Sequence, residues 1–157
     1  MIQFVEGDIF ESDAEALVNP VNCVGVMGAG LAAQFKRRFP ENFSAYRSVC
    51  TLGQLKPGVL FIFERGDCVL SPRYIVNFPT KLHWRERSDL RYISSGLEAL
   101  LQEVRARHIK SVAIPPIGCG LGGLDWDSVL VLIERSFGKL QDVQATVVTL
   151  GDAGGLK

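Results

Sequence analysis

The sequence predicts one α/β domain built on a mixed, largely parallel β-sheet. Two observations lead to this fold class. Short, continuously apolar segments alternate along the chain with segments of ten or more residues that have helical periodicity. The length of 157 residues suits a single domain. Because buried parallel strands need helices on both faces, we expect three layers, α/β/α.

The first third of the chain predicts two strands and two helices. Apolar residues at 2–5 and 16–19 favour strands, and a glycine-rich loop follows at 25–30. Leu31, Phe35 and Phe39 recur every four residues, which is typical of the apolar face of a helix. Pro40 is expected to end that helix or to start the next, and a second helix is expected over 41–50.

The remainder predicts four strands and two longer helices. Segments 59–63 and 74–78 are rich in β-branched and aromatic residues, and 111–115 and 143–150 are similar. Ser88 is expected to cap one helix, and Asp125 or Asp127 the other. Residues 1–150 would therefore form the domain, and 151–157 a tail or the start of a linker.

Composition limits the function classes. The 17 basic and 17 acidic residues balance, which argues against a general polyanion binder but leaves room for a local basic patch. No apolar run approaches the ~20 residues that span a membrane, and no secretory signal is evident, so we expect a cytoplasmic protein without a membrane partner. No C-x-x-C pair occurs among Cys23, Cys50, Cys68 and Cys119, so neither a zinc site nor a thioredoxin-type redox pair is indicated. No metal or organic cofactor is expected.

Two glycine-rich loops carry the strongest functional signal. The first glycine loop (residues 26–31, VMGAGL) and the second glycine loop (residues 118–123, GCGLGG) each lie between a predicted strand and a predicted helix. Glycine lets backbone amides approach phosphate oxygens, and a helix amino terminus adds partial positive charge. Neither loop matches the Walker sequence or the full G-x-G-x-x-G spacing. At the carboxyl edge of one sheet, the two loops together indicate a phosphate-bearing ligand.

Several short segments, spread over residues 1–150, form a more specific set. They are residues 7–9 (GDI), 18–22 (VNPVN), 27–32 (MGAGLA) and 116–121 (PIGCGL). A chain with this set resembles the macrodomain family. Residues 77–81 (NFPTK), 83–85 (HWR) and 120–124 (GLGGL) make it most similar to the DarG-type branch, the DNA ADP-ribosyl glycohydrolase antitoxins.

The resemblance implies a three-layer macrodomain that binds ADP-ribose. Asp8 would accept a hydrogen bond from the adenine amino group, with Ile9 beside that ring. Asn22 would bind the distal ribose and position it for catalysis. The two glycine loops would grip the diphosphate and flank the distal ribose through Gly28, Ala29, Gly30, Leu31, Gly118, Cys119, Gly120, Leu121 and Gly122.

Lys81 is the catalytic residue that the resemblance implies. The implied hydrolase removes ADP-ribose from thymine in ADP-ribosylated, single-stranded DNA, a repair reaction that reverses a partner DNA ADP-ribosyltransferase toxin. A neutral amine could attack the anomeric carbon, which requires desolvation or a neighbouring cation such as Arg85 or Arg87. A charged amine could instead stabilise the departing base. The sequence leaves both mechanisms open.

Plainer interpretations of these residues also stay open. Lys81 could be an ordinary surface lysine, and Asn22 could bond only its own turn. His83, Trp84 and Arg85 could form a turn with the tryptophan packed inward, or a lip that contacts DNA.

Two other functions remain open for the chain as a whole. One is a non-catalytic ADP-ribose reader, and the other is a hydrolase of ADP-ribose from acidic side chains of proteins. The protein-directed relatives carry a carboxylate where this chain has Gly122, which favours the DNA-directed type. Asp125 is near enough in sequence to replace that carboxylate, but helix capping is an equally good role for it.

Overall fold

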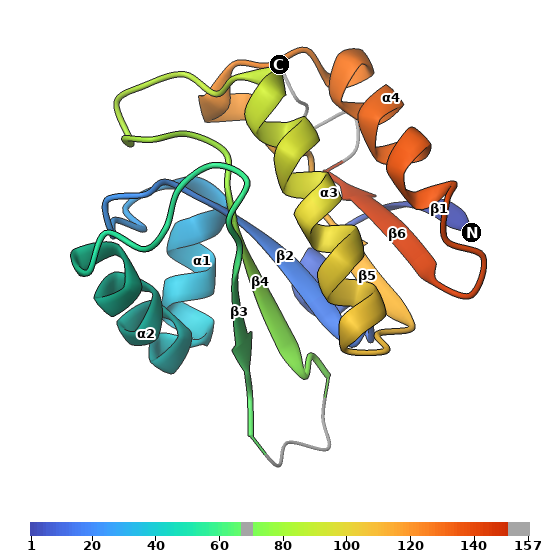
Figure 1. Ribbon diagram of the computed structural model, residues 1–157, viewed down its shortest axis with the longest axis horizontal. Coiled ribbons are helices and arrows are strands. Elements are labelled where there is room, and N and C mark those ends of the chain that lie inside the picture. The colour runs from blue at the N-terminus through green and yellow to red at the C-terminus, as the bar shows by residue number, and fades with distance from the viewer. Residues whose placement is uncertain (67–70, 151–157) are drawn as a thin grey trace.

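The computed structural model describes residues 1–66 and 71–150; Cys68 and the tail expected at 151–157 lie outside them. In the described residues, six strands form one sheet in the order β1-β6-β5-β2-β4-β3 (Figure 1). All neighbouring strands are parallel except β3 and β4. The mixed, largely parallel sheet is therefore confirmed. Its strands are β1 (Ile2–Glu6), β2 (Ala16–Val21), β3 (Phe61–Glu64), β4 (Tyr74–Pro79), β5 (Ser111–Ile114) and β6 (Gln144–Thr149).

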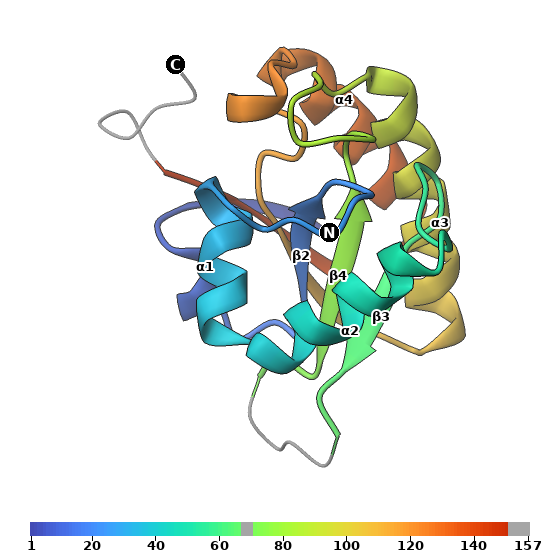
Figure 2. The ribbon, with the colours of Figure 1, turned by 90° about the vertical axis from the view of Figure 1, so that its left-hand side faces the viewer.

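Helices cover both faces of the sheet, as Figure 2 shows. On one face lie α1 (Gly30–Arg38) and α2 (Pro40–Thr51), and on the other α3 (Leu90–Ala106) and α4 (Trp126–Phe137). Asp125 caps α4, as expected, by accepting from the backbone N–H of Ser128. The prediction that Ser88 caps α3 is wrong. Asp89 is the cap and accepts from the N–H of Arg91, because the chain stays extended for one residue more.

The core is divided by the sheet into two parts. Leu17 and Ile75 pack with Phe35 of α1, whereas their strand neighbours Val18 and Val76 pack under α3 and α4. Successive side chains of a strand point to opposite faces, so a strand covered on both sides must be apolar throughout. Burying each such side chain contributes roughly 1.5–3 kcal/mol.

Three buried asparagines join β2, α2 and β4. The Asn77 Nδ2 donates to Asn42 Oδ1 over 2.8 Å, and the Asn19 Nδ2 donates to Asn77 Oδ1 over 3.2 Å. All three side chains are excluded from solvent. The network ties together the ends of β2 and β4, the strands that lead to Asn22 and Lys81.

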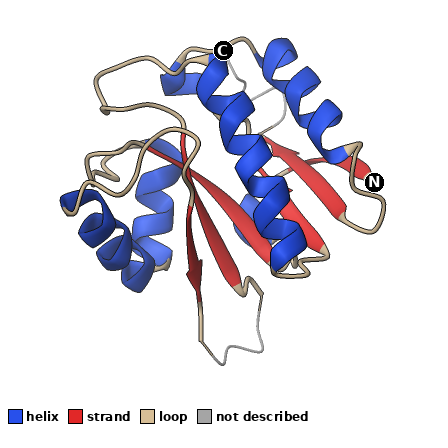
Figure 3. Ribbon diagram, viewed as in Figure 1, coloured by secondary structure: helices blue, strands red, loops and turns tan. Residues whose placement is uncertain are grey.

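The loops that follow the parallel strands gather at one edge of the sheet. In Figure 3, the tan segments after β2, β4 and β5 run together at the upper edge, and both glycine loops are among them. In residues 1–66 and 71–150, no helix is both long and apolar enough to cross a membrane.

Candidate functional site

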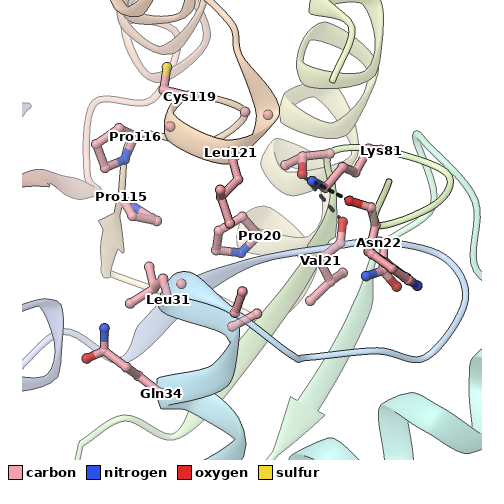
Figure 4. Close-up of a pocket in the computed structure, with 18 of the residues that line it drawn as sticks. Pro20, Val21, Asn22, Leu31, Gln34, Lys81, Pro115, Pro116, Cys119 and Leu121 are labelled. Atoms are coloured by element: carbon pink, nitrogen blue, oxygen red, sulfur yellow. Dashed lines mark hydrogen bonds between the residues drawn. The ribbon is translucent and has the colours of Figure 1, made fainter. Parts of the chain in front are cut away.

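A large cavity of about 1130 Å³ opens at this edge of the sheet (Figure 4). Both glycine loops line it, and Pro20 and Val21 at the end of β2 lie between them. It extends from the loop after β1 to the loop after β4. Four strand spacings separate β1 from β4, so these loops start about 19 Å apart. The cavity therefore suits an elongated ligand.

Positive φ angles shape the two glycine loops. Gly30 has a φ of 60°, Gly118 of 76° and Gly120 of 61°, a region that glycine adopts without strain. Gly30 also begins α1, and Ala29 before it has no side-chain group to cap the helix. The amides of the first turn are therefore left to bind an anion in the cavity.

Asp8 lies at the end of the cavity that follows β1. Its Oδ1 accepts from the Phe10 N–H over 2.9 Å, and its Oδ2 lies 3.9 Å from an Arg38 nitrogen. These contacts orient the carboxylate and leave it acceptor capacity toward the cavity, which Ile9 also lines. Adenine recognition by this pair stays a prediction.

Asn22 lies at the opposite end, beside Lys81 (Figure 4). Its Nδ2 donates to the Val26 carbonyl over 2.8 Å, and its Oδ1 accepts from the Tyr46 hydroxyl over 2.8 Å. Burial raises the pKa of Tyr46, so the hydroxyl keeps its proton. In this structure Asn22 holds its own loop, as the plainer interpretation expects, and its contact with a ribose stays a prediction.

Lys81 begins an exposed segment between β4 and α3, which we call the lip (residues 81–88). The Lys81 Nζ donates to the Trp84 carbonyl over 3.3 Å. The Trp84 side chain is 46% exposed, with the Arg85 guanidinium 4.6 Å from its ring centre. The alternative in which Trp84 packs inward is therefore wrong, because the ring lies over the cavity and the arginine instead of over the core.

One family model matches a stretch of the chain that contains most of the residues described above. The Macro domain family model matches residues 18–133. This chain belongs to the macrodomain family. The resemblance noted in the sequence is therefore confirmed, and the matched residues include β3, β4 and β5, most of β2, both glycine loops and the lip.

Two curated relatives are close to this macrodomain in sequence. It is 49% identical to the DNA ADP-ribosyl glycohydrolase of Mycobacterium tuberculosis and 46% identical to that of Thermus aquaticus. Each alignment covers 94% of this chain, but only 42% and 41% of the two relatives. The macrodomain thus spans less than half the length of these proteins.

Solved structures show the same fold. The macrodomain of Mycobacterium tuberculosis DarG superposes with a TM-score of 0.92 at 49% identity and covers 94% of this chain and 97% of that one. Thermosipho africanus DarTG in complex with ADP-ribose matches with a TM-score of 0.88 at 34% identity, covering 96% of this chain and 42% of that one.

The macrodomain places nearly all of the expected site residues on the cavity. Of the expected residues, only His83 lies off the cavity wall; its ring stacks 5.3 Å from that of Trp84. The glycine-loop residues expected to bind the diphosphate all line the cavity, and so do both arginines, Arg85 and Arg87, expected near Lys81.

Several further residues line the cavity and were not predicted as site residues. Gln34 lies one turn after Gly30, and Thr80 directly precedes Lys81, so position relative to the motifs could have found both. Pro116 lies in the quoted segment 116–121, whereas Glu86 carries no comparable signal. No group of three or more histidine, cysteine, aspartate or glutamate side chains that could hold a metal occurs in residues 1–66 and 71–150.

Gly122 has no space for a side chain. A Cβ at this position would collide with the Ser88 hydroxyl and approach the Ser88 Cβ to 3.1 Å. Asp125 does not replace a carboxylate here, because its Oδ2 accepts from the Ser128 N–H over 3.1 Å and the Ser128 hydroxyl over 2.9 Å. It is a helix cap and does not line the cavity.

Cys119 is a packing residue of the second glycine loop. Burial, with a smaller contribution from the negative charge of Asp125, raises the pKa of its thiol from 9.0 to about 11. The thiol is therefore neutral near pH 7, and the nucleophile required for covalent catalysis would be a thiolate. Cys119 is therefore a poor candidate nucleophile.

Proposed function

We propose that this macrodomain hydrolyses the bond between ADP-ribose and a base of single-stranded DNA, with thymine as the expected base. The observation that carries the proposal is the position of Lys81, at one end of an elongated cavity and beside Asn22. The names of the two curated relatives support it. The reaction would make the protein the antitoxin of a DNA ADP-ribosyltransferase, acting in the cytoplasm where DNA and toxin meet.

The substrate would lie along the cavity from Asp8 to Lys81. The adenine would contact Asp8 and Ile9, and the diphosphate oxygens would accept hydrogen bonds from the backbone amides of the two glycine loops. The distal ribose would then lie at Asn22 and Lys81. The modified strand would leave across the lip, where Trp84 can stack on a base and Arg85 can meet a phosphate.

The reaction breaks the bond between the anomeric carbon and the base nitrogen, and water supplies the new oxygen on that carbon. The departing nitrogen takes a proton. As an ammonium group, Lys81 would supply this proton or stabilise the negative charge that develops on the base. As a neutral amine, it would form a bond to the anomeric carbon that water then replaces.

Turnover of defined substrates tests the proposal. The protein is incubated with an oligonucleotide ADP-ribosylated on thymidine and, separately, with a protein ADP-ribosylated on acidic side chains, and free ADP-ribose is followed. We expect release from the DNA. Binding without release from either substrate would make the macrodomain a reader, and release from protein alone would make it a protein-directed hydrolase.

Lys81→Ala is expected to lower kcat by about 10²–10⁴-fold, the usual size of a lost proton-transfer catalyst. Affinity for ADP-ribose should remain, because the diphosphate is held elsewhere. Lys139→Ala, at an exposed position outside the cavity, is the matched control. Wild-type turnover by Lys81→Ala would refute the role of the lysine.

Borohydride trapping of ADP-ribose on Lys81 would favour the covalent mechanism. The absence of trapped ADP-ribose would favour the electrostatic mechanism.

A further inference from the structure

The lip is attached at both ends to segments that form the ligand cavity. Near its start, the Leu82 carbonyl accepts from the Cys23 N–H over 3.0 Å, next to Asn22. At its end, the Ser88 N–H donates to the Gly122 carbonyl over 2.9 Å. The Arg87 guanidinium donates to the next carbonyl, that of Gly123, over 3.1 Å. The end of the lip is thus fastened to the second glycine loop.

The contact between Ser88 and Gly122 is unusually close. Gly122 is not among the residues with positive φ, so backbone conformation does not demand glycine there. The space does, because an added Cβ would collide with the Ser88 hydroxyl and lie 3.1 Å from its Cβ. Glycine at 122 is therefore explained by the approach of the lip.

Ser88 itself has no other evident task. Its hydroxyl is buried and, within the part of the chain that the structure describes, has no hydrogen-bond partner. Asp89, and not Ser88, caps α3. Buried hydroxyls without a partner are unfavourable, so hydrogen bonding by the side chain does not explain a serine at this position. Close packing on Gly122 accounts for a small residue here.

We propose that the Ser88–Gly122 contact positions Lys81 for catalysis, by making the lip follow the second glycine loop; this inference rests on the proposed function. The rest of the lip is mostly exposed, and the Lys81 amine is held by one bond of 3.3 Å within the lip. A diphosphate bound to the second glycine loop fixes Gly122, and through Ser88 it fixes the lip. Ser88 and Gly122 are thus positioning residues that couple ligand binding to the place of the amine.

Gly122→Ala tests this coupling. The added methyl group points at Ser88, so it should displace the lip and leave the ligand side of the loop intact. We expect kcat on the ADP-ribosylated oligonucleotide to fall by about 10- to 100-fold, as small misplacements of catalytic groups do. The affinity for ADP-ribose should change much less. A loss of both together would indicate general damage to the loop and overturn the proposal.

Compensating substitutions at residue 88 make the test specific. In Gly122→Ala/Ser88→Gly, both colliding side-chain atoms are gone and the nearest remaining atom, the residue 88 nitrogen, is 4.0 Å from the new methyl group. This double variant should recover most of the lost kcat. Gly122→Ala/Ser88→Ala keeps the 3.1 Å approach and should recover only part. If the first double variant stays as slow as Gly122→Ala, the contact does not position the lysine.

Gly53→Ala is the control for substitution of a loop glycine. It lies after α2, away from the cavity, and nothing lies within 4 Å of an added Cβ there. Its φ of 68° makes alanine strained, so this variant also shows what a loss of stability outside the cavity does to turnover. Its kcat should match that of the wild type. All variants are compared below their melting temperatures, so that unfolding does not contribute to the loss.

Fluorescence tests the coupling without turnover. The chain has two tryptophans, Trp84 on the lip and Trp126 in α4, so Trp126→Phe leaves only the lip reporter. ADP-ribose should change the Trp84 signal in this background, change it less in Gly122→Ala, and change it again in the Gly122→Ala/Ser88→Gly variant. An equal response in Gly122→Ala would overturn the inference. Wild-type protein that releases no ADP-ribose from DNA would refute the proposed function, yet this series would still decide the coupling.

Discussion

In this macrodomain, the hydrogen bonds of one site residue and the space around another depend on partners that are far away in sequence. Tyr46, 24 residues after Asn22, donates to the oxygen atoms of that asparagine and is fully buried. Ser88, 34 residues before Gly122, excludes any side chain from that position. Motifs in the sequence indicated Asn22 and Gly122 but not these partners. Two residues this far apart in sequence have no fixed distance between them until the sheet has formed.

The raised pKa of Cys119 predicts how stability changes in alkali. In the unfolded chain the thiol loses its proton near pH 9, whereas in the folded protein it does so near pH 11. Between these values the unfolded state binds fewer protons, so the free energy of unfolding falls as pH rises. Below pH 9 both states are protonated, and Cys119 contributes no pH dependence.

Urea denaturation between pH 8 and 11 measures this effect. Cys119→Ser should show a shallower loss of stability above pH 9 than the wild type, although other groups also titrate there. Part of the loss should persist because burial raises the pKa of Cys23 to about 11 as well. Identical pH profiles for the two proteins would mean that Cys119 is solvated in the folded state.

At the scale of elements, local patterns predicted every α-helix and strand of the described residues to within a few residues, but not the short 3-10 helices at Ile9–Glu11 and Gly120–Gly122. Helix α1 ends at Arg38 and α2 starts at Pro40, where the sequence places a boundary. The antiparallel direction of β3 was not predicted, although the connection from β3 to β4, residues 65–73, is shorter than the dozen or more residues that a parallel crossover needs. The cap of α3 was misplaced by one residue for a related reason: Ser88 and Asp89 are both good caps, and the tertiary contact with Gly122 selects between them.

The packing of α3 on β4 gives a prediction about Gly96. Alanine in a helix interior usually adds about 1 kcal/mol of stability over glycine. At this position an added Cβ would collide with the ring of Phe78, which is fully buried in β4. Overpacking should prevail, and Gly96→Ala should lower the free energy of unfolding by about 1–3 kcal/mol.

Chemical denaturation of four variants, Gly96→Ala, Ser94→Ala, Phe78→Leu and Gly96→Ala/Phe78→Leu, checks this. Ser94→Ala, at an exposed position of the same helix, is the control and should stay within about 0.5 kcal/mol of the wild type. The double variant Gly96→Ala/Phe78→Leu should lower the free energy of unfolding by less than the sum of the two single changes, because the smaller side chain at position 78 makes space for the added methyl group. Gly96→Ala as stable as the wild type would show that the helix moves away freely.

At the scale of the whole molecule, the cavity depends on the order of the strands. Residues that line it follow β1, β2, β4 and β5, which are distant in sequence but share one edge of the sheet. Alternating strands and helices predicted that edge, since parallel strands end on the same side. The sequence could not give the strand order, and hence not the distance between Asp8 and Lys81, because register and order arise from long-range pairing. The family resemblance supplied what local patterns could not.

A ligand that spans five strands, from β1 to β4, should stabilise the whole fold, and this separates binding from catalysis. At a free concentration of 100 times its Kd, ADP-ribose should add about 2.7 kcal/mol to the free energy of unfolding. For a domain of this size that corresponds to a rise in Tm of roughly 5–10 °C. Lys81→Ala should show the same rise, since the diphosphate and adenine contacts lie elsewhere in the cavity. Ribose 5-phosphate, which cannot reach from Lys81 to Asp8, should raise Tm less at the same concentration. If ADP-ribose leaves the Tm unchanged, the cavity is not its binding site, and the lysine has no bound substrate on which to act.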